Sequence, residues 1–247
     1  MRSADEPSIE VLPSPAAVVL AADQLFRATA AQSIAERGRF TVALSGGRTP
    51  NDLYRSLTTT TPDRAPLDWT RVHLFWGDER CVPPDHADSN YHNAMAALAG
   101  AAIPSDNVHR IAAETVPPES GAAAYESMLR SFFYLAPGTL PAFDLVLLGL
   151  GPDGHTASLF PGSSALDEHE RLVAATWVSS FHTHRITLTY PVLDAARQVV
   201  FLVTGTEKAE IARRLLRERD PALPSAHVRP TTGELIFLLD AEAAARL

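Results

Sequence analysis

The chain has 247 residues, of which 46% are hydrophobic and 20% are charged, and this composition is ordinary for a globular protein. The net charge of −8 and the lack of a basic run argue against nucleic acid as a partner, although a small pocket on an acidic protein can still attract an anionic metabolite. Because Cys81 has no second cysteine to pair with, residues 1–12 lack a signal-peptide pattern, and no apolar stretch is long enough to span a bilayer, we expect a cytoplasmic protein with no membrane partner.

The first half of the chain alternates between strand patterns and helix patterns. Residues 16–37 are Ala-rich and have the period of a long amphipathic helix, which Gly38 ends. We expect strands at 9–12, 40–44, 72–76 and 108–111, and further helices at 50–57, 90–98 and 119–134.

The second half continues this alternation. We expect strands at 143–149, 172–178, 185–189, 199–204 and 235–239, helices at 190–196 and 207–219, and a short helix after the last strand. Continuous Val-, Ile- and Leu-rich strands between helices are typical of parallel sheets that are covered on both sides. The pattern therefore predicts an α/β fold with a doubly wound, mostly parallel Rossmann-like sheet and helices on both faces. No internal repeat or low-complexity linker interrupts it, so residues 1–247 are expected to form a single domain.

The segment 45–50, Ser-Gly-Gly-Arg-Thr-Pro, lies between a predicted strand and a predicted helix. Thr49 is a suitable N-cap and Pro50 suits the first helical position. Free amides and the positive end of a helix dipole favour an anion there, above all a phosphate. The segment is not a P-loop, because the Gly-Lys-Ser/Thr ending is missing. A tight, well-capped turn without a ligand explains the same residues.

The segment 77–80, Gly-Asp-Glu-Arg, follows the strand at 72–76. Neighbouring residues of an extended segment point in opposite directions, so Asp78 and Glu79 are not expected to face one site, and a paired-carboxylate mechanism is not indicated. Arg80 can bind a phosphate or carboxylate through two N–H groups, or form an internal ion pair. Arg80 can also lower the pKa of the neighbouring Cys81 thiol, although the sequence shows no histidine partner for a catalytic cysteine.

The segment 149–155, Gly-Leu-Gly-Pro-Asp-Gly-His, follows another buried strand and matches the spacing of a dinucleotide fingerprint. That fingerprint also requires a full helix and an acidic residue after the next strand, whereas Pro161 and Gly162 end any helix early, so no nicotinamide cofactor is expected. His155 is a candidate general base near neutral pH, though a lone histidine is more often structural or simply exposed. Asp153 can orient the imidazole or only shape the turn.

Lys208, the only lysine among 21 basic residues, begins the helix after the strand at 199–204. A compact point charge is one reason to keep a lysine in an arginine-rich chain, and chance is another. Arg185, at the start of a predicted strand, can add a second positive charge or lie on the surface. His182 and His184 can face one way on a strand, but no third ligand with zinc spacing accompanies them, so no metal is expected.

Taken in order, these segments closely resemble the 6-phosphogluconolactonase family. The resemblance rests on Ser-Gly-Gly-Arg-Thr-Pro at 45–50, Gly-Asp-Glu-Arg at 77–80 with Ser-Asn-Tyr at 89–91, Gly-Leu-Gly-Pro-Asp-Gly-His-Thr-Ala-Ser-Leu-Phe-Pro at 149–161, Arg-Ile-Thr-Leu at 185–188 and Gly-Thr-Glu-Lys-Ala at 205–209. The related glucosamine-6-phosphate deaminases typically follow the histidine with Ile-Ala-Phe-Asn-Glu-Pro, and their glutamate acts in ring opening. This chain has Thr-Ala-Ser-Leu-Phe-Pro there, and it has Arg80 where the deaminases usually have tyrosine. Both differences favour the lactonases.

The resemblance implies a carboxylic ester hydrolase that converts 6-phospho-D-glucono-1,5-lactone to 6-phosphogluconate in the oxidative pentose phosphate pathway, with no cofactor. It implies His155 as general base with Asp153 beside it, and Gly151 to Gly154 amides as candidate oxyanion donors. The implied substrate and phosphate contacts are Ser45, Gly46, Gly47, Thr49, Asp78, Arg80, Gly151, Gly154, Arg185 and Lys208. The expected partner is a phosphosugar lactone, and the chain is expected to be a monomer or weak homo-oligomer. A deaminase or isomerase on the same scaffold, and a non-catalytic sugar-phosphate-binding protein, remain alternatives.

Overall fold

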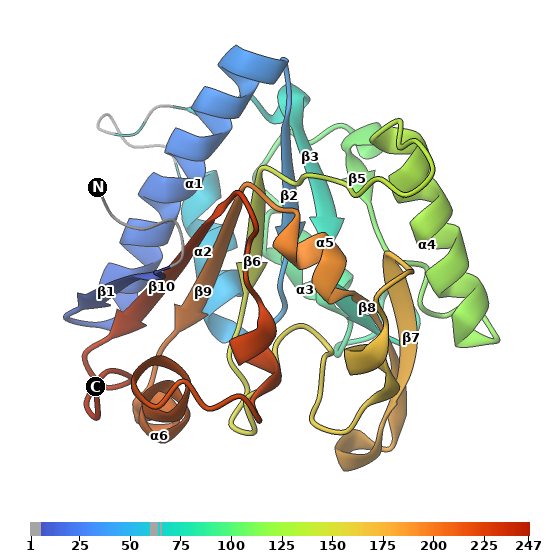
Figure 1. The fold of residues 1–247 in the computed structure, drawn as a ribbon. Helices are drawn as coiled ribbons and strands as arrows, with labels where there is room; N and C mark the ends of the chain where they lie inside the picture. The colour runs from blue at the N-terminus through green and yellow to red at the C-terminus, as the bar shows by residue number, and fades with distance from the viewer. Residues whose placement is uncertain (1–5, 60–63, 65) are drawn as a thin grey trace.

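The computed structural model describes residues 6–59, 64 and 66–247, so the first five residues of the expected polar N-terminus lie outside the described part (Figure 1). The strands are β1 (Ser8–Leu12), β2 (Phe40–Leu44), β3 (Val72–Trp76), β4 (Asp78–Arg80), β5 (Val108–His109), β6 (Leu145–Leu148), β7 (Val173–Val178), β8 (Thr183–Leu188), β9 (Gln198–Val203) and β10 (Glu234–Asp240). The α-helices are α1 (Pro15–Arg37), α2 (Arg48–Thr58), α3 (Asn90–Ala97), α4 (Pro118–Phe132), α5 (Tyr190–Asp194) and α6 (Ala209–Ala212).

The main sheet is parallel throughout, in the order β1-β10-β9-β6-β2-β3-β5. Every residue of the central strands β2 and β6 is buried, as expected for strands that are covered on both faces. Most of the buried hydrophobic side chains of the described residues form one connected core cluster around these strands. The predicted doubly wound, mostly parallel sheet is confirmed.

The direction of winding reverses between β2 and β6. From β2 the chain moves outward to β3 and β5, then returns to the other side of β2 with β6 and continues to β9 and β10. Right-handed crossovers then place α1, α2 and α3 on one face and α4, α5 and α6 on the other. In agreement, α1 packs on α2 and α2 on α3, whereas α4 packs on β7 and β8 (Figure 1). Ligands of open α/β folds bind at the carboxyl ends of the strands beside such a reversal.

A second, antiparallel sheet in the order β4-β8-β7 was not foreseen. The segments of β7 and β8 were expected as strands, but they form a hairpin beside the main sheet, and 78–80 is a strand of its own. Only four residues separate β7 from β8, and His182 there has a left-handed φ of 47°. Since parallel strands need a crossover of about a dozen residues, so short a connection allows only antiparallel pairing.

The helix ends explain the smaller differences from expectation. Helix α1 begins at Pro15, one residue before the expected start, because Ser14 is its N-cap and the Ser14 hydroxyl accepts from the Ala17 amide at 3.3 Å. The expected helix at 207–219 is a 3-10 turn at Thr206–Lys208, then α6, then a π turn at Arg213–Arg217. The expected C-terminal helix is absent: residues 241–247, which follow β10, form only turns, and seven residues are too few to propagate a helix.

Two stacked histidines join β3 to β5 at the edge of the sheet. His73 Nδ1 and His109 Nε2 lie 3.2 Å apart, and Phe132 packs edge-on against both rings. Burial lowers the pKa of His73. Burial, with smaller contributions from His73 and Arg39, lowers the pKa of His109 to about 4. The folded protein therefore keeps both rings neutral at a pH where the unfolded chain takes up protons.

We expect this pair to destabilise the fold in acid. Because the folded pKa of His109 is depressed, its contribution to stability is present above pH 6.5 and is lost as the pH falls towards about 4. In urea unfolding experiments, His109→Phe should lose less of its free energy of unfolding across this range than the parent protein. Parallel pH dependences for the two proteins would contradict the assignment.

Candidate active site

A cleft of about 480 Å³ opens at the carboxyl ends of β2 and β6, where the winding of the sheet reverses. We call it the switch-point cleft. It brings together these residues predicted from the sequence: Ser45, Gly46, Gly47, Thr49, Asp78, Arg80, Gly151, His155, Arg185 and Lys208. Asp153 and Gly154 are not among the lining residues, although Asp153 contacts His155. Most of these residues lie in loops that follow the carboxyl ends of β2, β6 and β9, which a parallel sheet places at one edge. Asp78, Arg80 and Arg185 come from β4 and β8 of the small sheet beside it.

The start of α2 presents backbone amides to this cleft. Gly47, with a φ of 110°, is the N-cap, and no side chain caps the helix. Within the described chain, no hydrogen bond is formed by the amides of residues 46–49. Thr49 was expected to be the cap, but its hydroxyl instead lies 2.6 Å from the hydroxyl of Thr204 at the end of β9. Uncapped amides at a helix start are a suitable site for an anion.

Arg80 and Arg185 lie side by side in the cleft that the start of α2 also lines. They are direct cross-strand partners in β4 and β8, and Arg185 is only 9% exposed. The Nε atoms of both are buried and have no hydrogen-bond partner among the described residues. Burial, and then the charge of Arg80, lowers the pKa of Arg185, against the attraction of Asp78. Like charges opposed on neighbouring strands, with unpaired buried donors, destabilise the empty site, and an anion bound between them would remove both penalties.

Lys208 adds a third positive charge from the other half of the sheet. It ends the 3-10 turn that follows β9 and lines the cleft with Glu207. The turn begins at Gly205, whose φ is 101° and whose amide donates to the buried carboxylate of Asp240. A φ of 101° is one that residues with a Cβ rarely adopt, so the turn requires glycine here.

His155 is held in a defined orientation. Its Nδ1 lies 2.5 Å from Asp153 Oδ1, and its ring stacks on Phe160 with centroids 3.9 Å apart. Because a carboxylate only accepts, Nδ1 carries the proton and Nε2 is left with a lone pair. Burial lowers the pKa of His155, although Asp153 acts in the opposite direction. The imidazole is therefore neutral, and able to accept a proton, at and below neutral pH.

Gly151 and Gly154 leave room for the neighbouring side chains of His155 and Leu223, but their amides are not free to donate to a ligand. A Cβ at Gly151 would lie 2.1 Å from His155 Nδ1, and a Cβ at Gly154 would lie 2.7 Å from Leu223. The Gly151 amide donates to the His155 carbonyl and the Gly154 amide donates to the Gly151 carbonyl. Both amides are thus already paired, so among the amides of the 151–154 turn that were expected to face an oxyanion, only that of Asp153 has no partner in the described residues. Gly154 serves the turn and does not line the cleft.

Asp78 and Glu79 point in opposite directions, as the extended segment predicted. Asp78 lines the cleft, where its carboxylate accepts from Ser158 Oγ at 2.6 Å and from Asn90 Nδ2 at 3.2 Å. Glu79 accepts from the amides of Asn90 and Tyr91, both at 2.7 Å, and so caps α3. Burial raises the pKa of Glu79 and these amides lower it. Glu79 is therefore part of the framework beneath the cleft.

Asn90 and Ser158 are site residues to which the sequence alone assigned no role. Asn90 Nδ2 also donates to the Asp78 carbonyl at 2.9 Å, and its side chain fills the space that a Cβ at Gly46 would need. Asn90 thus connects the segment 45–50, which contains Gly46, with β4. The Ser-Asn-Tyr motif was visible in the sequence, but only the folded structure brings it against Gly46 and Asp78.

Chemistry outside the cleft is limited in the part of the chain that the structure describes. Burial raises the pKa of Cys81 to about 11, so the lowering of this pKa that Arg80 could have caused is not found. Among the described residues, no three His, Cys, Asp or Glu side chains gather as metal ligands, and no helix is long and apolar enough to cross a membrane.

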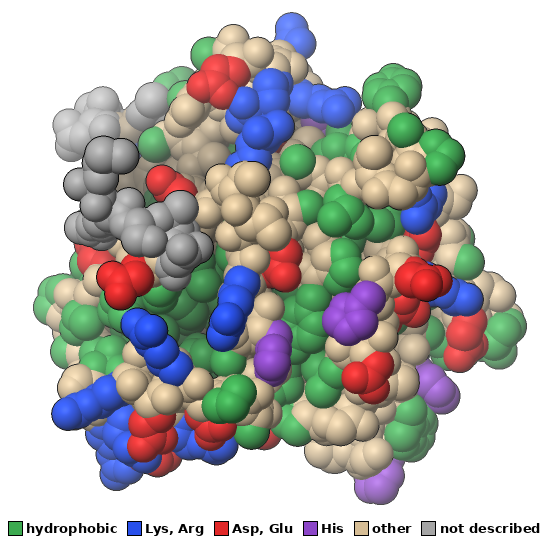
Figure 2. All heavy atoms as spheres, viewed as in Figure 1, with side chains coloured by type: hydrophobic (Ala, Val, Ile, Leu, Met, Phe, Trp, Pro, Cys, Tyr) green, Lys and Arg blue, Asp and Glu red, His purple; other side chains and the backbone are tan. Residues whose placement is uncertain are grey.

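On the face drawn in Figure 2, acidic and basic side chains are interspersed rather than segregated.

Comparisons with known proteins find relatives of one family along nearly the whole chain. Residues 13–237 match the model of a family described as glucosamine-6-phosphate isomerases/6-phosphogluconolactonase. A 6-phosphogluconolactonase of Nostoc sp. is 42% identical over 243 residues, which are 97% of this chain and 98% of that protein. The human 6-phosphogluconolactonase is 40% identical over 248 residues, 95% of each chain. The solved structure of 6-phosphogluconolactonase from Trypanosoma brucei superimposes with a TM-score of 0.87 at 32% identity, covering 98% of this chain and 99% of that one.

Proposed function

The chain belongs to the glucosamine-6-phosphate isomerase/6-phosphogluconolactonase family, and from this premise we propose that it hydrolyses 6-phospho-D-glucono-1,5-lactone to 6-phosphogluconate. One observation carries the proposal beyond the family: a neutral histidine held by a carboxylate shares a single cleft with two arginines whose buried Nε atoms have no hydrogen-bond partner among the described residues. The first group suits activation of water and the second suits a phosphate.

The phosphate is assigned to the positive end of the cleft. Arg80, Arg185 and Lys208 supply charge from three different elements, and the uncapped amides at Gly46 and Gly47 add donors. A planar guanidinium can bind phosphate through two parallel N–H groups, whereas the lysine acts as a point charge. Anchoring the phosphate there holds the lactone ring in the cleft that His155 also lines.

His155 is assigned as the general base. Nε2 takes a proton from water as the water oxygen bonds to the lactone carbonyl carbon, and Asp153 stabilises the imidazolium that forms. When the tetrahedral intermediate collapses, the bond from the carbonyl carbon to the ring oxygen breaks, and the imidazolium returns its proton to that oxygen. The amide of Asp153 is the one donor of the 151–154 turn with no partner in the described chain, and it is our candidate for the oxyanion.

The segment after His155 favours a lactonase over a deaminase. Phe160 stands where the deaminases have their ring-opening glutamate, and it stacks on the imidazole. Ser158 of the same segment donates to Asp78. Position 160 of this chain therefore carries no carboxylic acid, whereas the deaminases use the glutamate at the matching position in ring opening.

A coupled assay tests the proposal. Glucose 6-phosphate and its dehydrogenase generate the lactone in place, and 6-phosphogluconate formation is followed with and without the protein, after subtraction of spontaneous hydrolysis. We expect acceleration, and no ammonia release from glucosamine 6-phosphate. Ammonia release would establish the deaminase instead, and phosphosugar binding without any turnover would indicate a sensor.

A further inference from the structure

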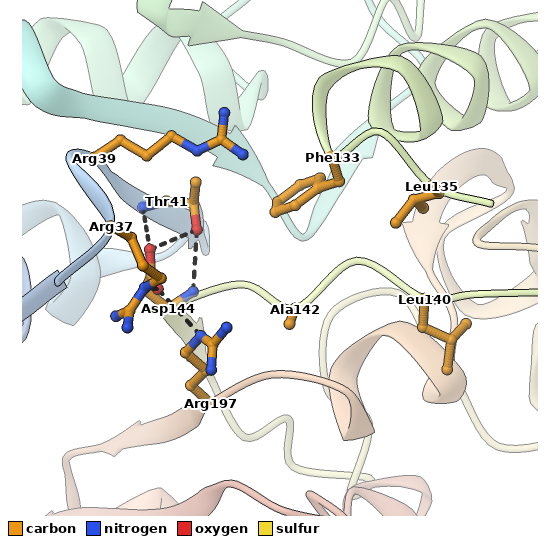
Figure 3. A pocket seen from close by; sticks show the side chains of 9 residues that line it. All are labelled: Arg37, Arg39, Thr41, Phe133, Leu135, Leu140, Ala142, Asp144 and Arg197. Atoms are coloured by element: carbon orange, nitrogen blue, oxygen red, sulfur yellow. Dashed lines mark hydrogen bonds and ion pairs between the residues drawn. The ribbon is translucent and has the colours of Figure 1, made fainter. Parts of the chain in front are cut away.

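A second cavity, of about 240 Å³, lies at the opposite edge of the sheet from the switch-point cleft (Figure 3). It is built on the residues that begin β2 and β6 and precede β9, together with the segment that follows α4. Its lining divides into a side with three arginines and an apolar side. None of its residues takes part in the proposed lactone chemistry.

Asp144 is the one acid in the lining, and its charge is already used. Its carboxylate accepts from the Thr41 amide and hydroxyl, both at 2.8 Å, and from Arg37 Nε at 3.0 Å, and it pairs with Arg197 Nε at 3.4 Å. Asp144 therefore pairs with both Arg37 and Arg197, and Arg37 also pairs with Glu36. The charged side of the cavity remains positive overall, since Arg39 adds a further charge.

Arg39 is the group that this arrangement leaves without an anion. Within the described chain it has no ion pair and no hydrogen bond, and its guanidinium lies 4.4 Å from the centre of the Phe132 ring. Its uncompensated charge is felt nearby, because after burial it helps to lower the pKa of His73. Figure 3 shows the side chain extending above the space between Asp144 and Phe133.

The opposite wall is apolar. Phe133, Leu135 and Leu140 face the space from the segment after α4, and Leu140 is 42% exposed (Figure 3). A wall of this kind offers no donors to a phosphate, which carries oxygens on all sides, but it suits the apolar body of an organic acid. A planar carboxylate also matches the fork of a guanidinium.

We propose that this cavity binds a small organic carboxylate with an apolar body, its carboxylate facing Arg39 and its body packed on Phe133 and Leu140. A ligand of this size is expected to bind with a dissociation constant on the order of 1 mM. Binding adds a partner for Arg39 and leaves the pairs of Asp144 in place.

Calorimetric titration with benzoate tests the proposal, with benzamide as its neutral counterpart. We expect benzoate to bind the parent protein, benzamide to bind at least ~10-fold more weakly, and Arg39→Gln to weaken benzoate binding ~10-fold or more. Arg55→Gln, which alters an exposed arginine of α2, should bind benzoate as the parent does. Retained lactone hydrolysis in each variant shows that it is folded.

A matched pair at the exposed Leu140 separates charge from packing. Leu140→Gln and Leu140→Glu both remove the apolar side chain, but only the second adds a negative charge beside the ligand. Leu140→Glu should therefore bind benzoate several-fold more weakly than Leu140→Gln. Equal binding of benzoate and benzamide, equal binding of inorganic phosphate and benzoate, or no heat of binding at millimolar benzoate would each overturn the proposal.

Discussion

Replacing His155 with alanine is expected to lower kcat for the phosphorylated lactone ~10²–10⁴-fold, the usual loss when a general base is removed. The substitution removes the Nε2 lone pair but leaves Arg80, Arg185 and Lys208 in place. KM should therefore change little. His169→Ala is a suitable control, because that histidine is exposed and lies outside the cleft. A kcat within twofold of the parent value would remove His155 from the mechanism.

The pH profile separates a base from a merely structural histidine. Since burial depresses the pKa of His155, kcat/KM should stay high as the pH falls through 6.5 and decline only below it. Asp153→Asn removes the charge that raises this pKa, so it should move the acid limb to still lower pH and reduce kcat by misorienting the ring. An acid limb above pH 6.5 in the parent would contradict this account.

Replacing Arg185 with methionine is expected to raise KM for the phosphorylated lactone ~10–100-fold, the effect of losing one or two charge-assisted hydrogen bonds. Methionine fills a similar volume in this 9%-exposed position but cannot bind phosphate. Hydrolysis of unphosphorylated glucono-1,5-lactone should be unaffected, because that substrate makes no use of the phosphate site. Equal losses on both lactones would show that Arg185 acts on the reacting ring instead.

Thermal unfolding gives the same variant a second readout. Arg185 opposes Arg80 across β4 and β8, so its removal relieves like-charge repulsion in the empty site. Arg185→Met should therefore melt no lower than the parent protein in buffer, and it should lose the stabilisation that inorganic phosphate gives the parent. Arg171→Met, which alters an exposed arginine before β7, should behave as the parent in both assays.

Local patterns were sufficient for the main sheet and for most of the site. Buried parallel strands such as β2 read as continuous apolar runs, and a parallel sheet delivers the loop after every strand to one edge. Ser45, His155 and Lys208 could therefore be expected together although they are far apart in the chain. Their convergence follows from the strand order alone.

What escaped prediction depends on contacts between distant segments. Nothing local to Arg80 reveals that Arg185 is its cross-strand partner, and nothing local to Gly46 reveals that Asn90 occupies the adjacent space. Thr49 has a good N-cap sequence, but the hydroxyl of Thr204 provides it with another partner. The amides of Gly151 and Gly154 were misjudged because the carbonyls that bind them lie within the turn itself, whose shape depends on the packing of His155 and Leu223.

The pairing of β1 with β10 has a consequence for synthesis on the ribosome. Ser8 aligns with Ile236, which lies 228 positions further along the chain, and β10 is the only neighbour of β1 in the described sheet. At roughly 5–20 residues per second, the nascent chain carries β1 for roughly 10–45 s before β10 has been made. During that interval the sheet can grow only from β2 outward, so β1 is the first strand of the described sheet to be made and among the last to dock.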